Sequence, residues 1–290
     1  MLKTVIFLLI ILILGLGFYF LVFKEKETQP QLLEKPMIEE TKLETSKEIA
    51  EKISIITVYD NYQVDPRLKT GWGFSCLVEA DSRGLQRGLT RILFDTGADS
   101  STLLANMEKL EINPKDIDIV VLSHIHGDHV GGLNGFLEKN RTVKLYIPAS
   151  FPVSYDNKTG EVIRIGQPTK IFENIWSTGQ MNTRVKEQSL VIDTKKGLVV
   201  ITGCAHPGVV NIVKKAKEIF PNQDIYLVLG GFHLFGASDS ELKEIINDFK
   251  KLGVQKVAPC HCSGDRTREL FKEEYHENFI DNGVGRIINI

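Results

Sequence analysis

The hydrophobic pattern of the chain begins with a run of twenty residues that carries no charge. Residues 4–23 read TVIFLLIILILGLGFYFLVF. A helix of that length, rising about 1.5 Å per residue, spans roughly 30 Å, which matches the hydrocarbon core of a bilayer. The run is longer than the apolar region of a signal peptide and lacks a small-x-small cleavage site. We therefore expect residues 1–23 to form a single-pass membrane anchor.

A polar segment follows the predicted anchor, and it covers residues 24–52. It is rich in Lys, Glu and Thr and has no aromatic residue, so it cannot bury enough apolar surface to offset the entropy lost on ordering. Lys3 precedes the anchor and Lys24 follows it, which leaves the side of the membrane open. We expect a solvated linker here and one large folded domain over residues 53–290.

Short apolar runs recur through residues 53–290, flanked by Gly, Pro, Asp or Asn, a pattern typical of strands. They are ISIITVYD, FSCLVEA, TRILFDTG, DIDIVVLSH, VKLYIPA, QSLVIDT, GLVVITG, DIYLVLGG and QKVAPCH. The early runs follow one another closely, which predicts hairpins. Apolar residues at helical spacing predict three helices between other runs, at about residues 101–110, 209–220 and 240–252. The last of these helices begins with a capping box at Ser238 and Glu241. Strands inside and helices outside predict an α/β sandwich.

The composition is that of an ordinary globular protein. Hydrophobic residues make up 42% and charged residues 25% of the 290 residues, which excludes a wholly disordered chain. A net charge of -2 gives no electrostatic reason to expect a nucleic acid as partner. Four cysteines are too few for a disulfide scaffold in a chain this long. Nothing in the sequence predicts an oligomeric state.

One stretch, VVLSHIHGDHVGGL, carries most of the candidate chemistry. It places His124, His126, Asp128 and His129 directly after an apolar run that reads as a strand. At this spacing His124 and His126 can point to one side of the turn, while Asp128 and His129 reach the other side. The stretch therefore offers ligands to two neighbouring metal ions, and each ion needs further ligands from elsewhere in the chain.

Two later histidines also follow predicted strands: His206 in ITGCAHPG and His261 in APCHCSG. They complete the expectation of a binuclear metal centre. One ion would be held by His124, His126 and His206, and the other by Asp128, His129 and His261. Zinc is the expected metal, and manganese and iron also accept His and Asp ligands.

These motifs, with the upstream Leu-Phe-Asp-Thr-Gly, resemble the metallo-β-lactamase superfamily over residues 53–290. The resemblance implies a four-layer αββα sandwich with a metal cleft at one edge. It also implies that Asp95 stands behind the metal loop and orients a ligand histidine. Taken by itself, Asp95 fits a turn or helix-start aspartate equally well.

A narrower resemblance rests on GWGFSCLVEA, ITGCAHPGVVNIV, LGGFHL and APCHCSG. Together they are similar to the branch named for 7,8-dihydropterin-6-methyl-4-(β-D-ribofuranosyl)aminobenzene-5′-phosphate synthase. The chain departs from that branch at STGQMNTR, where TGxIPR is usual, so the resemblance does not specify the substrate. Arg184, the last residue of this segment, is either a contact for an anionic group or an ordinary surface arginine.

The fourth metal motif of the superfamily usually contains a bridging aspartate, and no Gly-Asp occurs at that place in this chain. Cys204 and His233 are the metal-capable residues nearby. Cys204 is either a small buried residue or a ligand, and His233 could contact metal or substrate. Cys260 and Cys262 are expected to pack beside His261.

The functional hypothesis is a membrane-anchored hydrolase that uses a water activated by two metal ions on a phosphorylated or ester-like small molecule. Asp128 and His233 are its expected catalytic residues, and Asp95 and Cys204 its supporting residues. The first alternative is the pterin-joining synthase that the narrower resemblance implies. The second is a metal-binding module without catalysis, which the complete set of six metal-capable residues disfavours.

Overall fold

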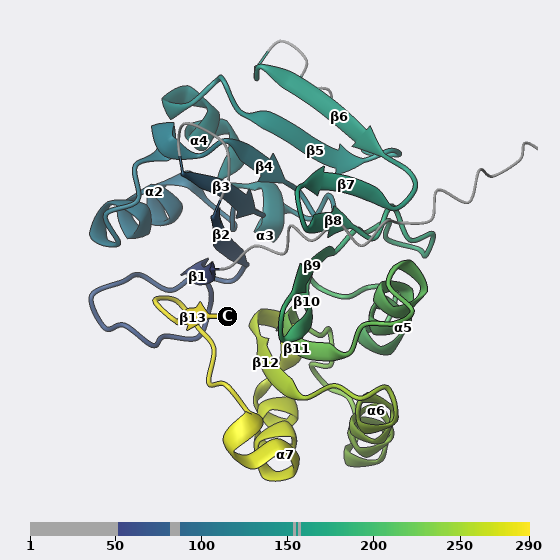
Figure 1. Cartoon of the computed structure of the whole chain (residues 1–290). Coiled ribbons are helices and arrows are strands. Elements are labelled where there is room, and N and C mark those ends of the chain that lie inside the picture. Colours follow the sequence, from purple (N-terminus) through teal and green to yellow (C-terminus); the bar gives the residue numbers. More distant parts are fainter. Residues whose placement is uncertain (1–51, 82–87, 153–154, 156–157) are drawn as a thin grey trace, which may run out of the picture. The chain divides into compact units, whose positions relative to one another are not determined.

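The structure, a computed structural model, describes residues 52–81, 88–152, 155 and 158–290, all within one compact unit, Glu48–Ile290 (Figure 1). Its first sheet contains seven strands. In spatial order they are β13 (Ile287–Asn289), β1 (Ile53–Tyr59), β2 (Ser75–Asp81), β3 (Leu89–Phe94), β4 (Ile119–Val121), β5 (Lys144–Pro148) and β6 (Glu161–Ile165). β1, β2 and β3 pair antiparallel, as the closely spaced early runs predicted, and β3 to β6 pair parallel.

The second sheet contains six strands. Their spatial order is β12 (Lys256–Cys260), β11 (Ile225–Gly231), β10 (Gly197–Thr202), β9 (Leu190–Thr194), β8 (Ile175–Ser177) and β7 (Thr169–Phe172). β10, β11 and β12 run parallel, so their carboxyl ends meet at one edge of the sheet. Such an edge is where α/β proteins place their sites.

Helices cover the outer face of each sheet. α2 (Ser100–Lys109) and α4 (Leu133–Lys139) lie on the first sheet, and α5 (Val209–Ile219), α6 (Asp239–Lys251) and α7 (Asp265–Tyr275) lie on the second (Figure 1). Shorter turns are η1 (Pro114–Asp116), α3 (Gly127–Val130), η2 (His261–Ser263) and η3 (His276–Asn278). The order helices, sheet, sheet, helices confirms the predicted α/β sandwich.

The strands are apolar on both faces because both faces are buried. In β2, Cys76 and Val78 enter the core between the sheets, whereas Leu77 packs under the helices of the first sheet. In β10, Val199 lies between the sheets and Val200 packs against the helices of the second sheet. Three hydrophobic layers thus hold the sandwich together, and the sequence shows continuous apolar runs in place of strict alternation.

The predicted capping box of α6 is present. The Ser238 side chain accepts from the backbone N–H of Glu241, and the Glu241 carboxylate accepts from the backbone N–H of Ser238. Gly253, with φ +75°, follows the end of the helix and adopts the left-handed conformation that favours glycine. Here the local sequence alone determines where the helix begins and ends.

The predicted anchor, residues 1–23, and nearly all of the predicted linker lie outside the described residues. Within the part of the chain that the structure describes, no helix is both long enough and apolar enough to cross a bilayer. The sequence reading also missed four strands (β6, β7, β8 and β13) and helix α4.

Candidate metal centre

The His-rich loop joins the end of β4 to the short helix α3. His124 follows the strand by two residues, and His126 stands at the start of α3, which carries Asp128 and His129. His206 and His261 arrive from the ends of β10 and β12 in the second sheet. Ligands from both sheets therefore meet at one edge of the sandwich, where the resemblance placed a metal cleft.

The structure brings the metal-capable side chains into two neighbouring groups. Group A consists of His124, His126 and His206. Group B consists of Asp128, His129, Cys204 and His261. In each group the donor atoms lie within 4.8 Å of one another. This is the division predicted for two ions, with Cys204 added to the second.

Group A presents ring nitrogens toward a common centre. His206 Nε2 lies 3.2 Å from His126 Nδ1, and the rings of His124 and His206 are 4.8 Å apart between centroids. His124 is fully buried, yet its Nε2 has no hydrogen-bond partner among the described residues. A buried nitrogen without a partner is costly in a protein interior, and a bound cation would satisfy it. The group therefore fits a metal ion.

Hydrogen bonds behind the loop determine which nitrogen faces each ion. Ser123 Oγ donates to Asp95 Oδ2 at 2.7 Å, so it accepts from His124 Nδ1 at 2.8 Å. Asp95 Oδ2 also accepts from His129 Nδ1 at 2.7 Å. With Nδ1 engaged in these bonds, both rings direct Nε2 toward the metal groups. Asp95 thus lies where the resemblance placed it.

Group B is held together by equally short contacts. His129 Nε2 lies 3.1 Å from Cys204 Sγ, and Cys204 Sγ lies 3.4 Å from His261 Nε2. Asp128 Oδ2 is 3.3 Å from His261 Nε2. On its far side, His261 Nδ1 meets Asn61 Oδ1 at 3.2 Å, which directs Nε2 toward the centre. Four donors with one sulfur fit a zinc-like ion.

The electrostatics suit cation binding. Burial, with the charges of neighbouring histidines, holds the pKa of His124 well below its ordinary value, and burial beside His233 and His126 lowers the pKa of His206 to about 4. Metal-binding imidazoles must be neutral, which these two rings are at pH 7. Although burial opposes it, the hydrogen bond from His261 lowers the pKa of Asp128, so this carboxylate stays ionised.

Burial also lowers the pKa of His129, but the Asp95 carboxylate outweighs that effect and raises the pKa to about 9. In the absence of metal His129 therefore holds a proton readily, and the side chains of His129 and Asp95 are both fully buried. A metal ion at group B would compete with the proton on Nε2.

Glu187 is a supporting residue that the sequence did not reveal. Its buried carboxylate accepts from the backbone N–H groups of Cys204, Ala205 and His206, at 3.1, 2.9 and 2.7 Å. Burial raises the pKa of Glu187 to about 7. One acidic side chain thereby shapes the loop that supplies a ligand to each group. A single glutamate before a strand carries no motif, so nothing in the sequence marked it.

Backbone strain gathers at this centre. Six described non-glycine residues have a left-handed φ, and four of them lie at the site: Asp95, Ala205, His233 and His261. A left-handed conformation of a non-glycine residue lowers stability, and it persists where the surrounding contacts hold the backbone in place. Gly203 matters for a related reason, since an added Cβ would stand 2.2 Å from Ser123 Oγ. The two sheets approach each other too closely there for any side chain.

The structure also locates the candidates that the sequence left open. His233 is exposed, and its ring centroid lies 4.3 Å from that of His206. Cys262 Sγ is 3.3 Å from Cys204 Sγ, whereas Cys260 Sγ lies near Asn282 Nδ2, at 3.4 Å. A third set of donor atoms within 4.8 Å, group C, consists of Cys204, His233 and Cys262.

Comparison with known proteins identifies the family. A protein of Methanocaldococcus jannaschii named 7,8-dihydropterin-6-methyl-4-(beta-D-ribofuranosyl)-aminobenzene-5'-phosphate synthase is 33% identical to this chain. The match covers 74% of this chain and 89% of that protein. The family model described as the metallo-beta-lactamase superfamily matches residues 85–210. The chain belongs to the metallo-beta-lactamase superfamily. Its narrower resemblance to the synthase branch is confirmed as well.

Solved structures of the superfamily show the same fold. Tm1679, described as a metal-dependent hydrolase, superposes with a TM-score of 0.67 at 31% identity, covering 82% of this chain and 99% of its own. The metallo-beta-lactamase fold protein YhfI from Bacillus subtilis has a TM-score of 0.59 at 15% identity, with coverage of 82% and 99%. The second likeness concerns the fold alone. Together they confirm the metallo-β-lactamase-like sandwich.

A small pocket of about 170 Å³ adjoins the metal centre of this superfamily member at His126. Arg184 and Lys186 line it together with Phe151, and no acidic residue is among its described lining residues. Neither cation has a carboxylate partner in the described part of the chain, so both charges can face an anionic ligand. The segment that departs from the synthase branch supplies Arg184 to this pocket.

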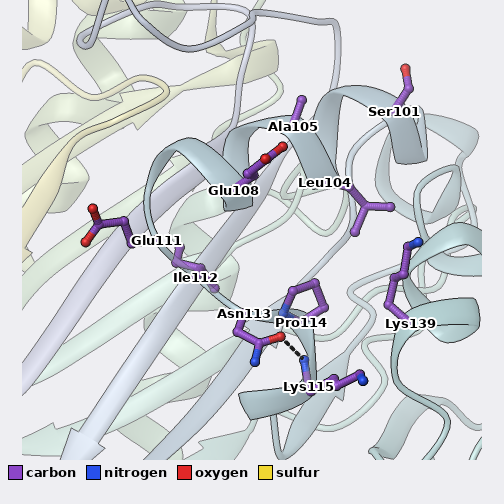
Figure 2. Close-up of a pocket in the computed structure, with 10 residues that line it drawn as sticks. All are labelled: Ser101, Leu104, Ala105, Glu108, Glu111, Ile112, Asn113, Pro114, Lys115 and Lys139. Atoms are coloured by element: carbon purple, nitrogen blue, oxygen red, sulfur yellow. Dashed lines mark hydrogen bonds between the residues drawn. The ribbon is translucent and has the colours of Figure 1, made fainter.

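A larger pocket, of about 730 Å³, lies away from the metal centre (Figure 2). It is bordered by α2 and η1, and Figure 2 shows Glu108, Glu111, Lys115 and Lys139 around it. None of the metal-capable histidines or cysteines lines it. Size alone therefore does not identify the functional site of this protein.

Proposed function

We propose that the chain is a metal-dependent hydrolase that acts on a phosphorylated or ester-like small molecule, with two divalent ions, zinc foremost, at groups A and B. One observation carries the proposal: the two ligand groups meet beside a pocket that offers two unpaired cationic side chains. Family membership and the 31% identity to a protein described as a metal-dependent hydrolase support it.

Two divalent ions at these groups would lower the pKa of a bound water and polarise the acceptor oxygen of the substrate. Asp128 is ionised and partly accessible, so it would orient the attacking water and accept its proton. Arg184 and Lys186 would hold an anionic group of the substrate in the adjoining pocket. His233, exposed beside group A at the end of β11, would contact the substrate there.

A second candidate function is the synthase reaction. The Methanocaldococcus jannaschii relative supports it at 33% identity, and the product in that protein's name carries a phosphate. Such a substrate also suits a cationic pocket. The two functions differ in the acceptor: water in the hydrolase and a second organic substrate in the synthase.

Turnover by the purified, metal-loaded full-length chain distinguishes the two. One panel contains phosphodiesters, phosphomonoesters and lactones, and the other contains a dihydropterin with an aminobenzene ribose phosphate. We expect hydrolysis in the first panel and its loss in His126→Ala and His261→Ala, which each remove one ligand from a different group and should lower metal content. Product formation only in the second panel would establish the synthase reaction. A variant with the wild-type rate would show that the substituted histidine is not a metal ligand.

We also propose that residues 1–23 anchor the enzyme to a membrane. The support is the charge-free run over residues 4–23. The side on which the catalytic domain lies is left open by the flanking lysines.

A further inference from the structure

Group C contains two donors, His233 and Cys262, that belong to neither group A nor group B, and it shares Cys204 with group B. Its sulfur and nitrogen atoms come from three adjacent strand ends: Cys204 after β10, His233 after β11 and Cys262 in η2 after β12. They lie within 4.8 Å of one another. Neighbouring parallel strands thus deliver one donor each to the same point.

We propose that group C is a third cation position, selective for thiophilic ions of the zinc class, which shares Cys204 with group B. The inference rests on the proposed metal centre and extends it from two ions to three. Cys204 Sγ, in contact with both His129 Nε2 and Cys262 Sγ, would be the bridging ligand.

The separation of the two sulfurs is suited to a shared ion. Two thiolates bound to one zinc ion at about 2.3 Å with tetrahedral angles lie roughly 3.8 Å apart. The observed 3.3 Å between Cys204 Sγ and Cys262 Sγ is close to that value and well above the length of a disulfide bond, about 2.05 Å. A small outward shift of either thiol would admit the ion.

The local backbone is built for close approach at this point. A Cβ added to Gly231 would stand 2.3 Å from the carbonyl oxygen of Gly203 and 2.8 Å from Cys262 Sγ. His233 holds a left-handed φ of 53°, which turns the chain sharply after β11. Both cysteines are almost completely buried, whereas His233 is exposed. The exposed histidine provides the entry path that a metal site requires.

Ligand chemistry gives the selectivity. Two sulfurs and one imidazole favour zinc and its analogues, whereas manganese and magnesium favour oxygen ligands. Groups A and B hold a single sulfur between them, so Cys262 is the residue that distinguishes a third position from a two-ion centre.

Cobalt(II) substitution of the full-length protein provides the test, because cobalt bound to thiolate absorbs by charge transfer in the near ultraviolet. Metal-free protein is titrated with cobalt under a non-chelating reductant, and bound cobalt is counted by mass spectrometry. We expect three equivalents in the wild type. Cys262→Ser should lose one equivalent and more than half of the charge-transfer absorption, since the bonds of the group C ion to Cys204 and Cys262 are both lost and only the bond from Cys204 to the group B ion remains.

Cys260→Ser is the matched control. It changes the same residue type two positions away, and its sulfur lies near Asn282, outside the three groups. It should keep all three equivalents and the full absorption. Circular dichroism of both variants checks that they fold.

Two equivalents in the wild type, with a spectrum that Cys262→Ser leaves unchanged, would overturn the third position while leaving the two-ion enzyme intact. Lost absorption without a lost equivalent would also overturn it, because Cys262 would then serve the ion of group B. Loss of two free thiols on exposure to air, with no cobalt bound at group C, would show a disulfide pair instead. A wild type that binds no cobalt would reject the proposed metal centre together with the inference.

Discussion

Asp128 is a single side chain with two proposed roles, as a metal ligand and as a general base. It lies 3.3 Å from His261 Nε2 as a member of group B, and in the proposed mechanism its partly exposed carboxylate would also orient the attacking water. The depressed pKa keeps it ionised but also makes it a weak base. General-base assistance contributes about 10² to 10⁴-fold, and a weak base belongs at the lower end.

We therefore expect Asp128→Asn to lower kcat by about 10²-fold beyond any loss of metal, since Asn keeps the shape but not the proton affinity. The assay is run in excess metal, so that bound metal, measured in parallel, is equal in the two proteins. Asp116→Asn, an exposed aspartate in η1, is the control and should be unaffected. Wild-type activity at matched occupancy would make Asp128 a ligand only and move attention to His233.

Arg184 provides a test of the cationic pocket beside His126. A hydrogen bond to a charged group contributes about 1.5–3 kcal/mol, so Arg184→Gln should raise KM for a phosphorylated substrate by roughly tenfold or more. kcat should change little, because this guanidinium binds a part of the substrate that does not react. Arg141→Gln, at another exposed arginine, should leave KM unchanged. Equal KM values for Arg184→Gln and the wild type would place Arg184 on the ordinary surface.

At the level of the elements, Asp99 links helix α2 to β1. Its carboxylate caps the helix by accepting from the backbone N–H of Thr102 at 2.8 Å, and it also accepts from Tyr59 Oη at 2.9 Å. Burial works against ionisation, but the bond from Thr102, with those from Ser101 and Tyr59, lowers the pKa of Asp99 to about 2. The capped form is therefore the ionised form.

We expect Asp99→Ala to destabilise the fold by about 1 kcal/mol near pH 7, the usual loss for a helix cap. Because the folded-state pKa lies below the ordinary value of 3.8, this stabilisation is present above about pH 4 and is lost as the pH falls through about 2. Denaturant unfolding of both proteins across that range measures it. A difference that stayed constant down to pH 2 would show that ionisation is irrelevant to the cap.

The strands and helices also show which parts of the fold could be predicted from the sequence. Continuous apolar runs predicted nine of the thirteen described strands, and the Ser238 capping box predicted α6, because both signals are local. β7 and β8 are short, partly exposed and without a strong apolar run, so no periodicity distinguished them. The His-rich loop predicted groups A and B for a similar reason: four metal-capable side chains stand within six residues.

Other parts of the site depend on contacts between distant residues. Glu187 meets the Cys204–His206 loop from another segment, and Asn61 meets His261 from a position 200 residues away. The approach of Cys262 to Cys204 likewise depends on how β10 and β12 flank β11. Neither the spacing nor the type of these residues predicts the contacts, because the contacts form only when the sheet has formed.

For the molecule as a whole, the metal centre is a product of the complete sandwich. Group A takes two side chains from the loop after β4 in the first sheet and one from the second sheet, and group B takes two from each. Metal binding should therefore be coupled to folding of the entire domain, and removing the metal should lower the stability of both sheets together.

This coupling also determines how a chain without the first 52 residues should behave. β1 pairs with β2 and β13 through residues from Ile53 onward. A chain of residues 53–290 should therefore unfold in one transition and bind as much metal as the full-length protein. If residues 1–23 form the proposed anchor, the full-length protein should stay with membranes through an alkaline carbonate wash, while the shortened chain should not. Calorimetry, metal analysis and fractionation measure the three properties separately. A shortened chain that fails to fold would reject the domain boundary, and a full-length protein released by the wash would reject the anchor without affecting the metal centre.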